Sequence, residues 1–415
     1  MQDLMRFSDL PDYAFPRLRT LLNEINNGKL EIPMDIGEPT HPFPNFIIEK
    51  ILTHSATFNS YPPNDGLPEL LFTISKWLEN RYKIPPLDPE QNIISLNGTR
   101  EGLFNAALAL CPEIKNGRPP AILIPNPFYQ CYMVAAKASG AEPIFVPATL
   151  ETGFLPNFKR LSSDILNRTA LCYICSPSNP QGAIASEKYW TELFEMAETY
   201  NFRVLADECY SEIYRDKKPP GALEVASKLA LNPERLVVFN SLSKRSNLPG
   251  LRSGFAAGGR VAITELKKLK SYSGAPSPTP LQYAAEAAWS DESHVIENRL
   301  LYREKLEIAD TILKDVPNYS SPESGFFLWL PVNNGENAAI DLWSRFGIKV
   351  LPGAYLSNIN HTSFDETNPG QNYIRVALVG TKNQIKLGLR SIADYLNVKK
   401  YKGPDHDDGS IPEQV

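Results

Sequence analysis

From residue 92 onward the sequence alternates short apolar stretches with amphipathic ones. The apolar stretches lie at 92–96, 121–124, 142–146, 170–175, 202–206 and 236–239. Stretches with helical spacing separate several of them, at 100–110, 128–139 and 187–199. Apolar strands that alternate with helices are typical of a mostly parallel sheet with helices on both faces. The pattern therefore predicts an α/β fold, with one more strand at 255–257.

The length of the chain and the pattern after residue 290 predict a second, smaller unit. At 415 residues the chain exceeds the size at which a single core usually keeps growing. A long amphipathic helix at 293–313 leads to three strands and a closing helix, at 325–330, 348–351, 373–378 and 384–396. Another amphipathic helix is expected at 16–25. We expect a large domain at 45–290, a smaller α+β domain from 1–44 and 291–398, and a polar, flexible tail at 399–415.

Composition argues against several classes of protein. The 42 Lys and Arg residues and the 47 Asp and Glu residues are intermixed and give a net charge of −5, without the basic patch expected for binding nucleic acid or lipid. No apolar run reaches the roughly 18 residues of a membrane span, and the first residues lack the apolar stretch of a signal peptide. The odd number of cysteines, five, suggests no disulfide framework. We expect a cytoplasmic protein that binds neither nucleic acid nor membranes.

Two of the cysteines, Cys172 and Cys175, form a C-x-x-C pattern inside a predicted strand. Residues three apart on a strand point to opposite faces of the sheet, which disfavours both a redox pair and half of a zinc site. We therefore expect buried core thiols and no metal.

Polar residues gather in four stretches next to predicted strands. These stretches are Asn97–Arg100, Ser176–Gly182, Ala206–Tyr210 and Asn240–Gly254. In an open α/β sheet, ligands bind beyond the carboxyl ends of the strands, where such loops meet. Each stretch also has a purely structural explanation, as a helix cap, a rigid turn, a salt bridge or a solvated loop. The four stretches taken together indicate which ligand the site could bind.

The last two stretches supply an amine and a carboxylate. Lys244 follows a predicted strand, with hydroxyls at Ser241 and Ser243 and a guanidinium at Arg252, eight positions on. Asp207 ends an apolar strand, where a carboxylate costs free energy unless a cation pairs with it. Such a site could hold a carbonyl compound that carries a phosphate.

One ligand satisfies all four stretches, pyridoxal 5′-phosphate (PLP). Lys244 would form a Schiff base with its aldehyde and later move the substrate proton. Asp207 would keep the ring nitrogen protonated, so that the ring draws electrons from the substrate α-carbon. Asn179 and Tyr210 would bind the ring hydroxyl. The phosphate would be held by hydroxyls, a guanidinium and the amides at a helix start, from Ser241, Ser243, Arg252, Gly98, Thr99 and Arg100.

The same motifs resemble those of a known family. The patterns N-P-x-G at 179–182, A-D-E-x-Y at 206–210 and S-x-S-K at 241–244, followed by Arg252, resemble the class I and II aminotransferases of PLP fold type I. The resemblance covers about residues 37–396. It implies a large domain with a mostly parallel sheet sandwiched by helices, and a smaller α+β domain.

The resemblance also implies roles for residues outside these motifs. Tyr129 matches an aromatic side chain that stacks on the cofactor ring. Tyr61 matches a tyrosine that reaches the phosphate of the neighbouring subunit, which implies a homodimer with shared active sites. Arg375 matches an arginine that grips the substrate α-carboxylate, a task suited to a planar bidentate donor. Gly37 matches a glycine that lets the N-terminal strand pass close over the substrate, and Asn179 is also expected to contact the substrate.

Several segments resemble the bacterial succinyldiaminopimelate transaminases in particular. They lie at 15–19, 97–102, 125–130, 241–254 and 297–305. This resemblance implies transfer of the amino group of N-succinyl-L,L-diaminopimelate to 2-oxoglutarate, in ping-pong steps through a pyridoxamine form, as part of lysine biosynthesis. Within these segments, residues 245–247 have no role that their chemistry assigns.

Three other functions would use the same cofactor contacts. One is an aminotransferase of broad specificity for alanine, aspartate, acetylornithine or aromatic amino acids. Another is a PLP-dependent β-lyase. A PLP-sensing domain of a transcription regulator is disfavoured by the acidic net charge.

Overall fold

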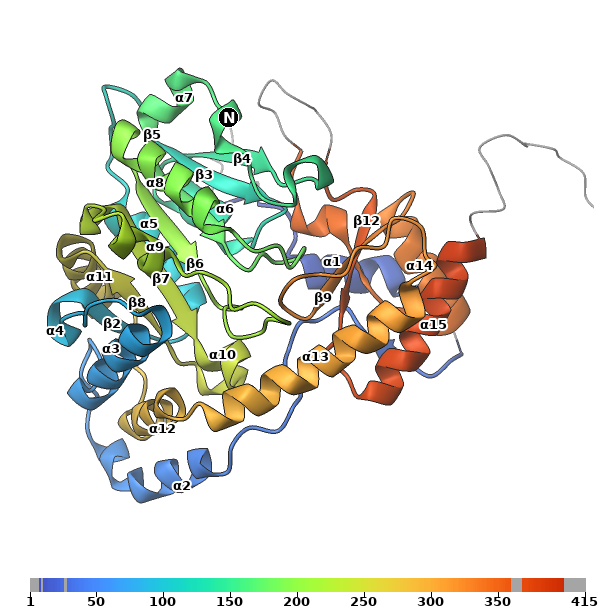
Figure 1. Cartoon of the computed structure of the whole chain (residues 1–415), viewed down its shortest axis with the longest axis horizontal. Helices are drawn as coiled ribbons and strands as arrows, with labels where there is room; N and C mark the ends of the chain where they lie inside the picture. Colours follow the sequence, from blue (N-terminus) through green and yellow to red (C-terminus); the bar gives the residue numbers. More distant parts are fainter. Residues whose placement is uncertain (1–6, 9, 26–27, 360–367, 399–415) are drawn as a thin grey trace, which may run out of the picture.

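The computed structural model describes residues 7–8, 10–25, 28–359 and 368–398, and its largest element is a seven-stranded sheet (Figure 1). The strands are β2 (Ile93–Leu96), β3 (Ala121–Asn126), β4 (Glu142–Pro147), β5 (Thr169–Cys175), β6 (Arg203–Asp207), β7 (Leu236–Ser241) and β8 (Gly254–Gly258). Their order is β2-β8-β7-β6-β5-β3-β4. Strand β8 runs antiparallel to both neighbours, and every pair from β7 to β4 is parallel. The predicted mostly parallel sheet is confirmed.

Helices cover both faces of this sheet. One face packs against α5 (Thr99–Leu110), α6 (Cys131–Ala138) and α11 (Arg260–Ser273). The other face packs against α3 (Pro68–Tyr82), α8 (Glu187–Tyr200), α9 (Ala222–Lys228) and α12 (Thr279–Ser290). Strand β7 shows how its apolar run serves two cores, because Leu236 and Val238 join one and Val237 and Phe239 join the other.

A second apolar core surrounds a three-stranded antiparallel sheet. This sheet has the order β11-β12-β9, with β9 (Phe327–Pro331), β11 (Leu351–Pro352) and β12 (Tyr373–Ala377). The core is completed by helices α1 (Ala14–Leu22), α13 (Ser293–Leu313), α14 (Gly335–Phe346) and α15 (Lys382–Val398). Two short strands, β1 (Ile32–Pro33) and β10 (Ile348–Lys349), pair beside it. Helix α13 runs from the side of α10 and α12 to α15, so it bridges the two cores (Figure 1).

The remaining helices are short, and some boundaries differ from the predictions. Four helices were not predicted in the large-sheet region, α4 (Pro89–Asn92), α7 (Ser163–Arg168), α9 and α10 (Leu242–Arg245). Helix α2 (Phe46–Thr53) precedes this region and contacts α12. Helix α1 begins before the predicted residue 16, and α6 begins after the predicted residue 128 because Phe128 N donates instead to Leu356 O at 2.8 Å. The stretch predicted as one strand at 348–351 divides into β10 and β11, since its two ends pair with different strands.

Helix α14 was also missed by sequence reasoning, since Asn333-Asn334-Gly335 has the composition of a turn. In the structure Asn334 caps the helix, with its side chain accepting a hydrogen bond from Asn337 N at 3.0 Å. The predicted tail at 399–415 lies outside the described residues.

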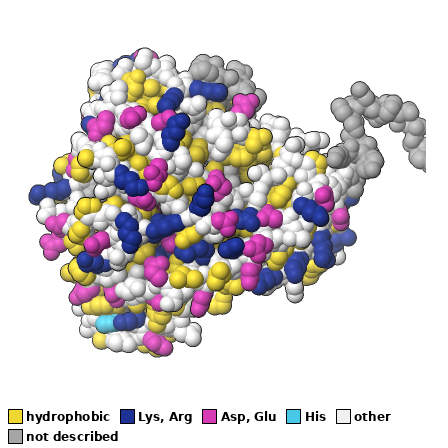
Figure 2. Space-filling view, viewed as in Figure 1, with side chains coloured by type: hydrophobic (Ala, Val, Ile, Leu, Met, Phe, Trp, Pro, Cys, Tyr) yellow, Lys and Arg dark blue, Asp and Glu magenta, His cyan; other side chains and the backbone are white. Residues whose placement is uncertain are grey.

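Charged side chains of both signs are intermixed on the face shown in Figure 2. None of the helices within the described ranges combines the length and apolar character needed to cross a lipid bilayer.

A buried carboxylate holds the segment after β6 between two helices. Glu212 receives hydrogen bonds from Arg81 Nε of α3 at 2.5 Å and from Arg299 Nη2 of α13 at 2.8 Å. Arg299 Nε also donates to the backbone oxygen of Glu212 at 3.0 Å. The side chains of Glu212 and Arg81 are almost fully buried, so water does not solvate their charges and each charge is stabilised by the other.

Replacing Glu212 tests this dependence. Glu212→Ala leaves two guanidinium groups without their carboxylate, and we expect a loss of about 3–5 kcal/mol in the free energy of unfolding. Glu187→Ala, which removes an exposed partner of Lys228, is the control and should cost less than about 1 kcal/mol. Denaturant unfolding followed by tryptophan fluorescence measures both, and equal losses would contradict the role given to Glu212.

Candidate active site

A cavity of about 270 Å³ lies beyond the carboxyl ends of the central strands. Its lining includes the last residue of each of three neighbouring strands, Cys175 of β5, Asp207 of β6 and Ser241 of β7. Residues distant in the sequence, Gly37 and Arg375, close it from the side of the second core. The four polar stretches predicted from the sequence therefore meet where the strand order predicts.

Lys244 lies in the single helical turn α10, which directly follows β7. The stretch predicted as a loop thus contains a turn of helix, capped by Ser241, whose Oγ accepts a hydrogen bond from Ser243 N at 3.2 Å. Lys244 Nζ donates to Gly37 O at 2.6 Å. Burial lowers the pKa of Lys244 to about 8, so a large fraction of the amine is neutral near that pH.

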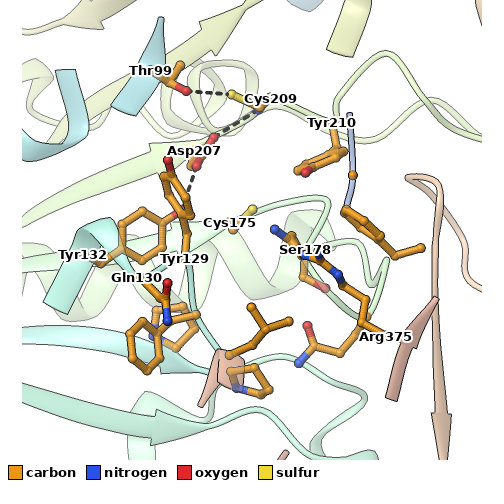
Figure 3. Close-up of a pocket in the computed structure, with 18 of the residues that line it drawn as sticks. Thr99, Tyr129, Gln130, Tyr132, Cys175, Ser178, Asp207, Cys209, Tyr210 and Arg375 are labelled. Carbon is orange, nitrogen blue, oxygen red and sulfur yellow. Dashed lines mark hydrogen bonds between the residues drawn. The ribbon is translucent and has the colours of Figure 1, made fainter. Parts of the chain in front are cut away.

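Asp207 is a buried carboxylate held by neutral donors. Its oxygens accept hydrogen bonds from Tyr132 OH at 2.7 Å and from Cys209 N at 3.3 Å, as the dashed lines in Figure 3 show. Burial raises the pKa of Asp207, and these hydrogen bonds oppose the rise. Within the described residues no Lys, Arg or His forms an ion pair with it, so the site favours a ligand that brings a positive charge.

The start of α5 lies beside the guanidinium of Arg252. Arg252 donates to two backbone oxygens, Asn97 O and Pro249 O, each at 2.9 Å. Gly98 caps α5 with a φ of +81°, and a Cβ at this position would lie 2.4 Å from Arg252 Nη2. A glycine is therefore required here for both conformation and space. The site thus offers a set of donors suited to a phosphate, which are the backbone amides at the start of α5, the Arg252 guanidinium and the nearby hydroxyls of Thr99 and Ser241.

At the opposite side of the cavity, Arg375 donates hydrogen bonds to neutral amide and backbone oxygens. It donates from Nη1 to Asn179 Oδ1 at 3.2 Å and from Nη2 to Asp35 O at 2.8 Å. Its carbon Cζ lies 4.2 Å from the centre of the Phe327 ring. Burial lowers the pKa of Arg375 to about 10, which leaves it charged at neutral pH. A buried, planar cation of this kind fits a carboxylate.

Aromatic side chains and another arginine line the mouth of the cavity. Arg100 Nε donates to Tyr129 OH at 2.5 Å, and Arg100 Nη2 lies 3.5 Å from Tyr13 OH. Tyr210 is buried, with its ring centre 6.0 Å from that of Phe327. Figure 3 shows Tyr129 and Tyr132 across the cavity from Arg375.

The cavity brings together most of the residues named from the sequence. Twelve of them line it, Gly37, Thr99, Arg100, Tyr129, Asn179, Asp207, Tyr210, Ser241, Ser243, Lys244, Arg252 and Arg375. Gly98 does not line it but underlies Arg252. Tyr61 is fully exposed and does not reach the cavity of its own chain.

Sequence reasoning missed Tyr132 and Phe327, which support Asp207 and Arg375. Both lie in apolar stretches whose pattern indicates core residues, so the sequence carried no signal of a role at the site.

Comparisons with known proteins agree with this geometry. Residues 31–392 match the family model described as aminotransferase class I and II. The LL-diaminopimelate aminotransferase of Moorella thermoacetica is 30% identical over 410 residues, which cover 94% of this chain and 98% of that protein.

Two crystal structures share the fold at higher identity. An aminotransferase from Neisseria meningitidis is 36% identical with a TM-score of 0.89, over 94% of this chain and 99% of the other. Aminotransferase AspB from Helicobacter pylori is 35% identical with a TM-score of 0.85, over 93% of this chain and 99% of the other. The chain therefore belongs to the class I and II aminotransferases, which depend on pyridoxal 5′-phosphate.

Proposed function

We propose that this aminotransferase moves the amino group of N-succinyl-L,L-diaminopimelate to 2-oxoglutarate. The observation that carries the chemistry is the meeting of the half-buried amine of Lys244 with a buried carboxylate, Asp207, and a buried guanidinium, Arg375, around one cavity. The choice of donor is supported by the five segments that resemble succinyldiaminopimelate transaminases.

The residues of the cavity fit the cofactor. Within the described part of the chain the Asp207 carboxylate is hydrogen-bonded by neutral groups and feels the charge of Lys244 without forming an ion pair with it, and a protonated ring nitrogen would supply a direct cationic partner. Arg252, Ser241, Ser243, Thr99 and the amides that follow Gly98 would hold the phosphate. When bound, pyridoxal 5′-phosphate draws electrons from the substrate α-carbon and so makes its proton acidic.

Individual side chains of the cavity bind the substrate, transfer its proton and contact the cofactor ring. Arg375, steadied by Asn179, binds the substrate α-carboxylate. Lys244 Nζ takes the proton from the substrate α-carbon, a role that suits an amine with a pKa of about 8. Tyr210 and Asn179 bind the ring hydroxyl, and Tyr129 covers the ring.

Arg100 supports a substrate with a second carboxylate. Its guanidinium lies at the mouth of the cavity, where its hydrogen bonds go to the phenols of Tyr129 and Tyr13. Among the described residues no Asp or Glu pairs with it, so its charge is available to an anion. Both 2-oxoglutarate and the succinyl group carry such a carboxylate.

A second candidate donor is free L,L-diaminopimelate. Relatives named LL-diaminopimelate aminotransferase favour it, including that of Halothermothrix orenii, which is 30% identical over 94% of this chain. Both donors place the enzyme in diaminopimelate metabolism.

The assembly is also part of the proposal. The exposed ring of Tyr61 is available to the active site of a second copy, which supports a homodimer with shared sites. We propose that residues 45–290 form the cofactor domain and that 1–44 with 291–398 form the smaller one. The five cysteines are free thiols, which fits the proposed cytoplasmic location.

Lys244→Ala should abolish turnover and the yellow colour of the purified protein, because no other lysine among the described residues lines the cavity. Lys305→Ala is a matched control. Like Lys244, Lys305 has a pKa lowered to about 8 by burial and donates to a backbone oxygen, Val379 O, at 2.9 Å, but it does not line the cavity. Full activity in the Lys244 variant, measured by glutamate formation, would contradict the assignment.

Gly37→Ala should lower kcat/KM for the amino donor by about tenfold or more, because the added Cβ would lie 2.2 Å from the Phe327 ring that packs on Arg375. The control is Gly250→Ala, whose added methyl group meets no heavy atom within 4 Å. Steady-state kinetics measure both, and an unchanged kcat/KM in the Gly37 variant would argue against close passage of the chain over the substrate.

A panel of amino donors decides the substrate. With 2-oxoglutarate as acceptor, we expect kcat/KM for N-succinyl-L,L-diaminopimelate to exceed that for alanine, aspartate, acetylornithine and phenylalanine by about a hundredfold, since the site selects by several polar contacts. Higher activity with free L,L-diaminopimelate would favour the second candidate. Similar rates with all donors would indicate broad specificity, and release of pyruvate and ammonia from a cysteine conjugate would indicate a β-lyase.

A further inference from the structure

The helical turn that carries Lys244 is fixed from behind by one buried side chain. Asn298, on α13, donates from Nδ2 to Lys244 O at 3.1 Å and to Arg245 O at 3.3 Å. Asn298 is only 3% exposed, so water offers little replacement for these bonds. The contact joins the backbone of the lysine to a helix that leads into the second core (Figure 1).

The orientation of Asn298 is set by a histidine. Asn298 Oδ1 and His41 Nδ1 are 2.8 Å apart, which leaves the Asn298 amide nitrogen directed at the two backbone oxygens. His41 belongs to the strap formed by residues 37–42. The other end of the strap, Gly37, accepts the hydrogen bond from Lys244 Nζ at 2.6 Å. The strap therefore contacts the lysine both at its amine and, through Asn298, at its backbone.

Residues 245–247 anchor the far side of the same turn. Arg245 is buried and donates to Ala288 O at 2.7 Å and to Glu292 Oε1 at 2.6 Å, at the junction of α12 and α13. Asn247 lies 3.4 Å from the Pro42 carbonyl of the strap. The segment that had no assigned chemistry thus ties the lysine turn to the surrounding elements.

Ser246 completes this anchor and does not form a second active site. Its Oγ lies 2.8 Å from His294 Nε2, and His294 Nδ1 lies 2.5 Å from Asp291 Oδ2, an arrangement seen in serine nucleophiles. Ser246 is fully buried, however, so no substrate carbonyl can reach its oxygen.

We propose that Asn298, oriented by His41, is a positioning residue that keeps the Lys244 amine in the cavity, in contact with the strap. The proposal rests on the assigned role of Lys244 and adds a residue to it. Arg245 and Ser246 hold the turn to the fold, whereas Asn298 bonds to the lysine itself.

The readout is the reactivity of the Lys244 amine. Burial keeps its pKa near 8, and the substitution at Asn298 replaces none of the titratable and charged groups around it, which are Cys209, Arg375, Glu38, Arg252 and Asp207. A turn that is no longer held exposes the amine to water and moves its pKa toward the ordinary value for lysine. If the pKa rises by about one unit, the neutral fraction at about pH 8 falls from one half to about one eleventh, or about fivefold.

The experiment compares variants of the full-length protein after removal of the cofactor. Each is treated with acetic anhydride over a range of pH, and acetylation of Lys244 is measured by peptide mass spectrometry against exposed lysines of the same chain. In Asn298→Ala we expect labelling of Lys244 at about pH 8 to fall about threefold to fivefold, with a higher midpoint of the pH profile. In His41→Ala the fall should be in the same direction and smaller.

The matched control is Gln282→Ala on α12. Gln282 is likewise a buried amide: its Nε2 donates to Ser277 O at 2.7 Å and its Oε1 accepts a hydrogen bond from Leu67 N at 2.7 Å. Its loss therefore removes similar bonds, none of which goes to the lysine turn. An unchanged Lys244 profile in Asn298→Ala and His41→Ala, or an equal change in Gln282→Ala, would overturn the proposal. If Asn298→Ala does not fold, His41→Ala against Gln282→Ala decides it.

Failure of this inference is distinguishable from failure of the proposed function. The labelling profile reports on the amine without any substrate, whereas the aminotransferase role of Lys244 is decided by turnover in Lys244→Ala. An active enzyme in which Lys244 is required and the Asn298 variant labels normally would reject the positioning role alone.

Discussion

Burial of opposite charges that do not pair with each other is the constraint on which this site depends. Lys244 and Asp207 line one cavity, but the lysine bonds to a backbone oxygen and the aspartate to a phenol and a backbone amide. Burial favours the neutral form of each side chain, so it lowers the pKa of Lys244 and raises the pKa of Asp207. A ligand with a protonated ring nitrogen and an aldehyde would relieve both groups at once. The fold therefore holds them apart in a form that favours this kind of cofactor.

The arginines of the cavity follow the same rule. Arg252 and Arg375 donate to backbone or amide oxygens, and Arg100 donates to phenols. Neutral acceptors fix the direction of each guanidinium without cancelling its charge. Three cations presented in this way match the phosphate of the cofactor and the two carboxylates of the proposed substrates.

Much of the fold and of the site could be predicted from the sequence, because both depend on local patterns. Apolar runs marked the strands of the large sheet, and polar residues at the ends of β6 and β7 marked Asp207 and Lys244 as neighbours. The roles of Tyr132 and Asn298 depend on contacts between distant elements. Tyr132 lies on an apolar helix face, and Asn298 is 54 positions from the lysine whose backbone it binds. Their spacing in the sequence is that of ordinary helical residues, so only the packed structure reveals them.

The reversed strand β8 has a consequence for how this site can vary. Strand β8 lies antiparallel beside β7, with Ser241 paired to Gly254. The connection between these two strands therefore begins and ends on the same side of the sheet, where β7 ends and β8 starts. This connection consists of residues 242–253 and carries both the amine of Lys244 and the guanidinium of Arg252. An insertion or deletion within it would displace the two groups relative to each other and to the strand ends. The length of this connection therefore fixes how far apart the amine and the guanidinium lie, so recombination between relatives should preserve it intact.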